Sequence, residues 1–138
     1  RRIMIKKLIL ISTILIVTSG CSEAYEKYVE GQDVYLTCVE EGSDNKYPWW
    51  YSFDTDKEGE STGYYWRPSD PMTRLELKDV VIEPTHIRAR EGQVGVYLNR
   101  ESLVMISGLS FQCYAIGFQN AKNGREKHLE QLTKNNKI

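Results

Sequence analysis

The chain has 138 residues, of which 41% are hydrophobic and 27% are charged, so its composition is that of a folded protein rather than a disordered one. It carries 18 basic and 19 acidic side chains, and four of the basic ones lie in residues 1–20, which have no acid. Residues 21–138 therefore keep 14 basic against 19 acidic side chains. This balance argues against binding to nucleic acid, and against adsorption to an anionic membrane through basic side chains.

Residues 1–20 are organised like a secretory signal peptide. A basic start, which includes Lys6 and Lys7, is followed by an apolar run from Leu8 to Val17 and then by small residues. Such a run is too short to span a bilayer stably. We therefore expect residues 1–20 to be a signal peptide, which leaves enough chain for one domain.

The small residues end at Cys21, and Val17-Thr18-Ser19-Gly20-Cys21 resembles the lipobox of bacterial lipoproteins. Thr18 departs from the pattern, which prefers an aliphatic residue three places before the cysteine. The resemblance implies cleavage before Cys21 and attachment of lipid to its sulfur. Two or three acyl chains hold a soluble domain on a membrane stably. An ordinary secretory peptide with an incidental cysteine is the alternative.

The residues after Cys21 indicate where the anchor would hold the protein. By resemblance to enterobacterial lipoproteins, Ser22 in place of Asp implies an outer-membrane location in a bacterial cell envelope. In a host with a single membrane, the same anchor would keep the domain on the outer face of that membrane. Residues 21–32 are short and mostly polar, and we interpret them as a lipidated tether.

Two cysteines remain once Cys21 is assigned to lipid, and outside the cytoplasm Cys38 and Cys113 would form a disulfide. Closing the loop between them should stabilise the fold by about 4 kcal/mol in the chain-entropy model. Two buried free thiols are the alternative. We predict no metal site, because the chain has no CxxC motif and because His86 and His128 lack the spacing of ligands.

Apolar and polar residues alternate with a period of two through much of residues 33–118, as they do in strands with one buried face. Turn-forming residues separate the runs. The alternating segments are Val34–Val39, Trp49–Phe53, Leu75–Ile82, Ile87–Arg90, Val94–Asn99, Leu103–Ile106 and Leu109–Phe118. Six or seven short strands predict a mainly β domain over residues 33–118, a small antiparallel β-sandwich or barrel.

The last twenty residues have a different composition. Residues 119–138 are polar and basic, and Leu129 and Leu132 are their only pair of large apolar side chains before the final residue. A helix around Arg125–Thr133 is compatible with this pattern. Because two leucines bury little area, we expect a short, weakly docked helix or a frayed tail.

Eight of the fifteen aromatic residues fall between positions 47 and 66. Neighbours in a strand face opposite sides, so one face cannot bury both members of a consecutive aromatic pair. Exposed rings mark a protein interface or a platform on which a sugar stacks. The candidate binding residues are Trp49, Trp50, Tyr64, Tyr65 and Trp66. Alternatively, one tryptophan of the first pair lies in the core and the other rings pack under a loop over residues 55–72.

The remaining motifs do not predict a metal site or a catalytic site. Residues 54–59, from Asp54 to Gly59, are similar to the opening of a calcium loop, but the twelfth position is Tyr65 instead of a bidentate Glu. We therefore interpret the segment as a solvated acidic turn.

No GxSxG, HExxH or paired-carboxylate spacing is present, so we predict neither an enzyme nor a cofactor. Asn99-Arg100-Glu101 fits an exposed hairpin turn.

Four short elements lie in a suggestive order along the chain. They are a strand ending at Cys38, the segment Tyr51–Asp54, the pair Asn99-Arg100 and the closing Phe111-Gln112-Cys113. This order resembles small, uncharacterised two-cysteine exported β proteins of bacteria and their phages. Cys38, Trp50 and Cys113 also resemble the two cysteines and core tryptophan of an immunoglobulin domain. Neither resemblance implies an activity.

The function that we expect is that of a lipid-anchored envelope protein that binds another protein. By analogy with small phage or plasmid lipoproteins, it would occlude an outer-membrane receptor. By analogy with the periplasmic lysozyme inhibitors, whose motifs are not visible here, it would inhibit an envelope enzyme. An accessory role is the third form of this hypothesis. One alternative is a glycan- or peptidoglycan-binding module that uses the aromatic residues 47–66. Another is a structural subunit of an envelope complex.

Overall fold

The computed structural model describes residues 31–42, 44, 47–56 and 61–135. The expected signal peptide, Cys21 and most of the tether lie outside these residues, as do residues 57–60 of the acidic turn. Every element described below belongs to the unit that begins at Gln32.

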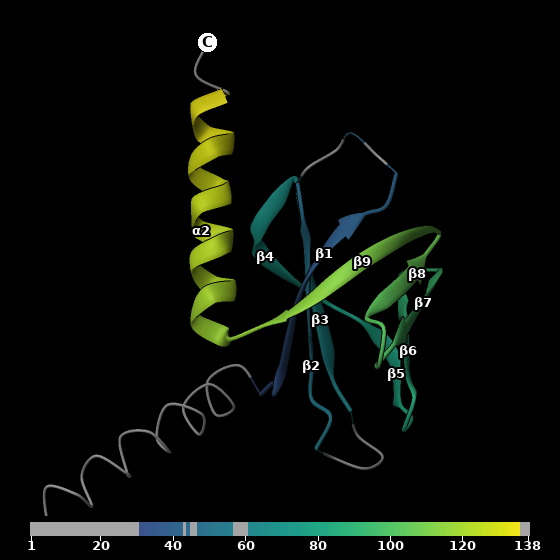
Figure 1. Cartoon of the computed structure of the whole chain (residues 1–138). Coiled ribbons are helices and arrows are strands. Elements are labelled where there is room, and N and C mark those ends of the chain that lie inside the picture. Colours follow the sequence, from purple (N-terminus) through teal and green to yellow (C-terminus); the bar gives the residue numbers. More distant parts are fainter. Residues whose placement is uncertain (1–30, 43, 45–46, 57–60, 136–138) are drawn as a thin grey trace, which may run out of the picture. The chain divides into compact units, whose positions relative to one another are not determined.

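Strands dominate the described part of the chain, and they form a single antiparallel sheet (Figure 1). The strands are β1 (Val34–Glu40), β2 (Trp49–Phe53), β3 (Gly63–Arg67), β4 (Asp70–Glu76), β5 (Lys78–Ile82), β6 (His86–Glu91), β7 (Val94–Asn99), β8 (Val104–Ser107) and β9 (Leu109–Ile116). The expectation of a mainly β domain is confirmed, with nine described strands instead of six or seven.

The sheet curls back on itself. Its strand order is β4-β3-β2-β1-β9-β8-β7-β6-β5, so the first strand pairs with the last one. The strands at the two ends of this order, β4 and β5, are consecutive in the chain and are separated by the buried Leu77 alone. They behave as one bent strand whose first half pairs with β3 and whose second half pairs with β6. The sheet is therefore nearly closed and barrel-like.

The inward-facing side chains fill the interior of the curled sheet. Their period of two is that of strands with one buried face, since successive side chains point to opposite sides. Tyr51 and Tyr65 lie opposite each other on β2 and β3, and their rings stack with centroids 6.1 Å apart. The buried cluster comprises Leu36, Cys38, Tyr51, Phe53, Tyr65, Leu77, Ile87, Ala89, Val96, Leu98, Met105, Phe111 and Cys113.

A disulfide joins Cys38 to Cys113, which confirms the predicted pairing. The two cysteines lie directly opposite each other on β1 and β9, inside the sheet. In an immunoglobulin domain the corresponding bond connects two facing sheets, whereas here it connects neighbouring strands of one sheet. The bond therefore reinforces the pairing that closes the meander.

Two strands occupy the segment that was expected to be a loop. β3 and the start of β4 lie within residues 55–72, on either side of a turn at Pro68 and Ser69. Pro71 sits inside β4, which is an end strand of the sheet. An edge strand tolerates proline because one side of its backbone needs no partner for the missing N–H. The prolines therefore mark a hairpin and not an irregular loop.

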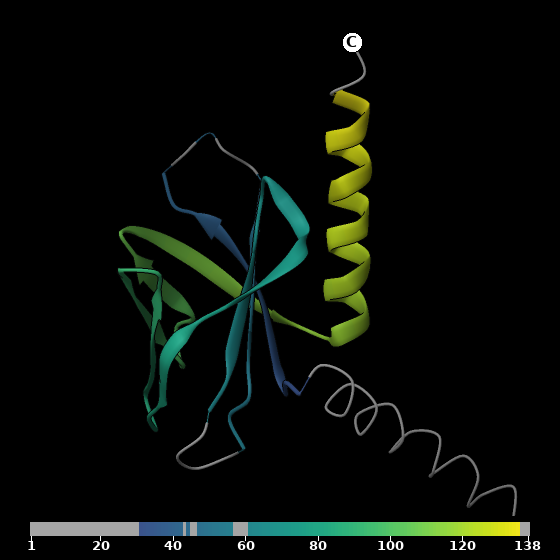
Figure 2. The same ribbon diagram turned by 180° about the vertical axis from the view of Figure 1, so that it is seen from behind.

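A helix, α2 (Phe118–Asn135), follows β9 after Gly117 and packs against β1 and β4, with β5–β8 on the side away from it (Figures 1 and 2). It is longer than the predicted segment 125–133. Its buried stripe is Phe118, Ala121, Arg125 and His128, at spacings of three and four residues. No helix in the described part of the chain is long and apolar enough to cross a membrane.

One polar pair reaches into the interior. The Tyr51 hydroxyl donates a hydrogen bond of 3.0 Å to Oε1 of Glu91. Burial raises the pKa of Glu91, against the lowering effects of this hydrogen bond and of the positive charge on Arg67. Burial, together with the negative charge of Glu91, also raises the pKa of Tyr51, so the phenol keeps its proton and stays a donor.

Replacing both cysteines by alanine, C38A with C113A, should lower the free energy of unfolding by about 3–4 kcal/mol, because the unfolded chain regains the entropy that the bond removes. Urea unfolding measures the change. A reductant should bring the unmodified protein to the level of the double variant and leave the variant itself unaffected. Equal unfolding midpoints for the oxidised protein and the variant would contradict a stabilising role.

The raised pKa of Glu91 predicts a pH effect with a defined sign. Above the ordinary pKa of a glutamate, the folded state holds a proton at Glu91 that the unfolded state has released, so rising pH costs stability until the raised pKa is passed. Glu91→Gln removes this proton linkage and keeps an oxygen that accepts the Tyr51 hydrogen bond. Urea unfolding between pH 4 and 8 should show the stability of the variant rising relative to the unmodified protein. A stability difference between the two proteins that stays constant from pH 4 to 8 would contradict the proton linkage.

Candidate functional site

The outer face of the sheet carries a row of four side chains that lie opposite one another across four strands. The row runs from Tyr114 on β9 through Thr37 on β1 and Trp50 on β2 to Trp66 on β3. Helix α2 covers the two tryptophans, each of which is 3% exposed, whereas Tyr114 is 55% exposed. The outer face therefore changes from covered to open along this row.

Arg125 holds the helix onto one end of the row. Its guanidinium carbon lies 4.1 Å from the centre of the Trp66 ring, and both residues are buried. A cation above a tryptophan face is stabilised by about 2 kcal/mol when water is excluded. A charged residue thus takes a place in the buried stripe of α2 that an apolar residue would ordinarily occupy.

His128 fixes the helix at a second point. Its Nε2 lies 2.7 Å from the carbonyl oxygen of Pro68, and because a carbonyl can only accept, Nε2 carries the proton and donates. The imidazole ring also meets Trp50 and Tyr47 edge-on, with centroids 5.4 and 4.9 Å away. His128 therefore ties α2 to the β3–β4 turn and to the segment that leads into β2.

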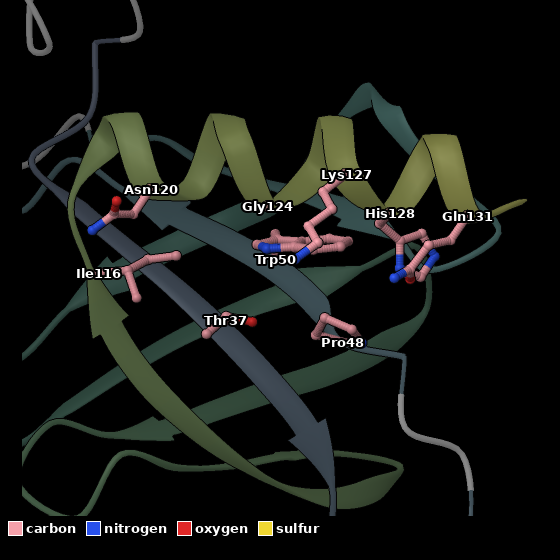
Figure 3. A pocket seen from close by; sticks show the side chains of 9 residues that line it. All are labelled: Thr37, Pro48, Trp50, Ile116, Asn120, Gly124, Lys127, His128 and Gln131. Atoms are coloured by element: carbon pink, nitrogen blue, oxygen red, sulfur yellow. The ribbon is translucent and has the colours of Figure 1, made fainter.

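A groove of about 330 Å³ lies between α2 and the outer face of the sheet (Figure 3). The Trp50 ring lies in its middle, beneath the helix, and Lys127 extends from the helix towards that ring. Polar side chains mark both ends, with Asn120 at one and Gln131 at the other. The groove is lined by Thr37, Pro48, Trp50, Ile116, Asn120, Gly124, Lys127, His128 and Gln131. A groove with an apolar floor and a basic rim suits an apolar side chain of a binding partner, flanked by acidic residues of that partner.

Gly124 faces Trp50 from the helix. A Cβ atom at this position would lie 3.7 Å from Nε1 of Trp50, which is an ordinary contact distance. The absence of a side chain therefore leaves room in the groove without being required by the packing.

The structure places the other predicted aromatic residues in several environments. Trp49 faces the interior, where its ring lies 6.3 Å from that of Phe111. Tyr65 is buried in the interior, and Tyr64 is half-buried with the Arg74 guanidinium 4.1 Å from its ring centre. Trp49 and Trp50 do face opposite sides, as the alternation predicts. The exposed part of this cluster is small, because the helix and Arg74 cover the rings on the outer face.

Sequence reasoning missed the apolar side chains that are exposed. Tyr97 and Ile106 lie opposite each other on β7 and β8, point outward and are each 53% exposed. Tyr114 lies on the same outer side of β9, four residues along the strand from Ser110, which is the residue opposite Ile106. The outer surface of β7, β8 and β9 that carries Tyr97, Ile106 and Tyr114 is called the open outer face. The signal that identifies them is an apolar residue at the outward position of an alternating strand, as Tyr97 is between Val96 and Leu98.

The described residues contain no group of three or more His, Cys, Asp or Glu side chains placed to hold a metal ion. Within the predicted acidic turn, Oδ1 of Asp54 accepts a hydrogen bond of 3.2 Å from the backbone N–H of Asp56. This local turn uses an oxygen that a calcium loop would direct to the ion. Residues 57–60 of that turn lie outside the described residues.

Comparisons with family models, with curated proteins and with solved structures found no match to this chain.

Replacing Gly124 by alanine should raise the free energy of unfolding by about 0.5–1 kcal/mol, because the methyl group meets only an ordinary contact and a mid-helix glycine is entropically costly. Gly63→Ala is a control for which we expect the opposite sign. Its Cβ would approach Phe53 and Leu77 within 3.0–3.1 Å, so this variant should destabilise the fold. Urea unfolding measures both changes. Destabilisation by the first variant would mean that α2 sits closer to Trp50 than the structure shows.

Proposed function

We propose that the chain is an exported, lipid-anchored envelope protein that binds another protein through the open outer face and the adjoining groove. The observation that carries the binding role is the open outer face, on which Tyr97, Ile106 and Tyr114 are each more than half exposed. Large apolar side chains gathered on a surface mark interaction sites, and tyrosine is enriched at protein interfaces.

The open outer face and the groove adjoin each other. Tyr114 lies directly opposite Thr37, which lines the groove, and Ile116 of the same strand also lines it. A partner could therefore cover the exposed rings and insert one side chain towards Trp50. Lys127 on the rim favours an acidic residue beside that inserted side chain.

Support for a protein rather than a glycan partner comes from the burial of the aromatic cluster. Stacking on a sugar needs a ring face that water can reach. Trp50 and Trp66 lie under α2, and Arg74 lies over Tyr64. The two rings that are more than half exposed, Tyr97 and Tyr114, lie on β7 and β9, and Tyr97 lies opposite the aliphatic Ile106. Such a mixed surface suits a protein better than a sugar.

The proposed anchor rests on the sequence around Cys21, which lies outside the described residues. The Cys38–Cys113 disulfide is consistent with export, because such bonds persist in oxidising compartments. An outer-membrane position follows from Ser22 and from the likeness to bacterial lipoproteins. Receptor occlusion, enzyme inhibition and an accessory role would all use the same surface.

A crosslinked pull-down of the tagged full chain from its own envelope, with mass spectrometry, tests the binding role. Y97K combined with I106K should reduce recovery of a specific partner at least about tenfold, because charges replace the apolar centre of the contact. Met72→Lys is the matched control, since Met72 is 45% exposed on β4, outside the open outer face. A partner recovered equally with all variants would contradict the proposed surface.

The same experiment separates the anchor from the binding surface. Cys21→Ser should move the protein out of the membrane fraction and leave the open outer face unchanged. Enrichment of peptidoglycan or polysaccharide fragments, with no protein above background, would overturn the protein-binding proposal in favour of the glycan module.

A further inference from the structure

A second cavity, separate from the groove, lies at one end of the sheet interior. Its volume is about 180 Å³, and its walls include the apolar side chains of Leu36, Ile87, Leu98 and Leu103. The polar residues that line it are Thr55 and Arg100. The cavity is open at one side, where Arg100 and Ala115 are exposed, and a largely apolar space with a cation at its edge differs from an ordinary packing defect, which has apolar walls throughout.

Arg100 also lines a larger, polar hollow of about 560 Å³ on the surface. Thr85, His86 and Asn99 contribute to the walls of this hollow. Arg100 is exposed, and it stands where the polar hollow and the apolar cavity meet, since it lines both of them. One molecule with a polar head and an apolar tail could occupy the two spaces together.

The backbone and side chain of Arg100 are held in place by two hydrogen bonds. Its backbone N–H donates to the carbonyl of Thr85 at 2.9 Å, and its Nη1 donates to the carbonyl of Glu83 at 2.8 Å. A guanidinium has five N–H donors, so donors remain for a ligand. Among the described residues no carboxylate forms an ion pair with Arg100; the carboxylate of Glu83 pairs instead with Arg88.

The turn that carries Arg100 also places an apolar wall beside it. Leu103 has a φ of 59°, in the left-handed region that non-glycine residues seldom adopt. Its N–H donates to the carbonyl of Asn99, and its carbonyl accepts from Cys113, each at 2.9 Å. The Asn99 side chain accepts two further backbone hydrogen bonds from residues 101 and 102. A left-handed residue commonly ends a short hairpin loop, and here it fixes Leu103 beside Arg100.

We propose that this cavity binds a small amphipathic carboxylate, with the carboxylate on Arg100 and the apolar tail against Leu98 and Leu103. The guanidinium presents paired N–H donors in the geometry that a carboxylate accepts. The volume suits a tail of about six non-hydrogen atoms, since a cavity of about 150 Å³ accommodates benzene. Glu101, which also lines the hollow, disfavours heads with more than one negative charge. The proposal is independent of the protein partner.

The test is a titration of the full chain, in phosphatidylcholine nanodiscs, with sodium hexanoate, followed by the methyl NMR signals of Leu98 and Leu103. Hexanoate should shift these signals saturably, and uncharged hexan-1-ol should bind at least about tenfold more weakly. Arg100→Gln should remove the preference for hexanoate over the alcohol. Arg90→Gln, which removes an equal charge from an exposed ion pair with Asp79, should leave hexanoate binding unchanged.

A cavity-filling variant checks the location of the tail. Ala115 also lines the cavity, and Ala115→Leu should abolish binding of both probes while the spectrum outside the cavity stays that of the folded protein. The proposal is overturned if hexanoate causes no saturable shift, or if hexan-1-ol binds as tightly. It is also overturned if the variants at Arg100 and Arg90 weaken binding equally, which would indicate a general effect of charge.

Discussion

The pairing of β1 with β9 is the constraint on which the rest of this structure depends. It joins the first and last strands of a meander, and the Cys38–Cys113 disulfide lies within it. Closing so long a loop is entropically unfavourable, and a covalent bond at the closure removes much of that cost from the unfolded chain. Because α2 follows β9 directly after Gly117, the same pairing also determines where the helix starts, beside β1.

The aromatic cluster supports the helix instead of forming an exposed platform. Trp50 and Trp66 occupy the outer face of neighbouring strands, where water would meet them if α2 were absent. The helix covers them with Arg125 and His128, whose contacts are a cation over a ring, an edge-on ring contact and a hydrogen bond. These contacts suit a polar helix, because they bury tryptophan faces without requiring an apolar stripe.

One hairpin contributes to both proposed binding sites. On β7 and β8, Tyr97 and Ile106 point outward to the open outer face, while Leu98 points inward to the cavity below Arg100. The open outer face and the cavity lie on opposite sides of the same strands, because neighbouring residues of a strand face opposite sides of the sheet. A ligand in the cavity therefore contacts the reverse side of the surface that we propose for the protein partner. The two sites remain testable separately, because their variants do not overlap.

The sequence by itself determined which side chains share a face of each strand, the cysteine pair and the hairpin turn at Asn99. These are local properties, set by the two-residue period, by redox chemistry and by turn-forming side chains. Only the tertiary structure decided that β1 lies beside β9, and which parts of the outer face are covered. Which part of the outer face is covered depends on the path of α2 across the sheet. The buried stripe of α2 contains Arg125 and His128, and from the sequence such polar residues are expected to be exposed. Alternation predicts that a ring points outward, but packing decides whether anything lies over it.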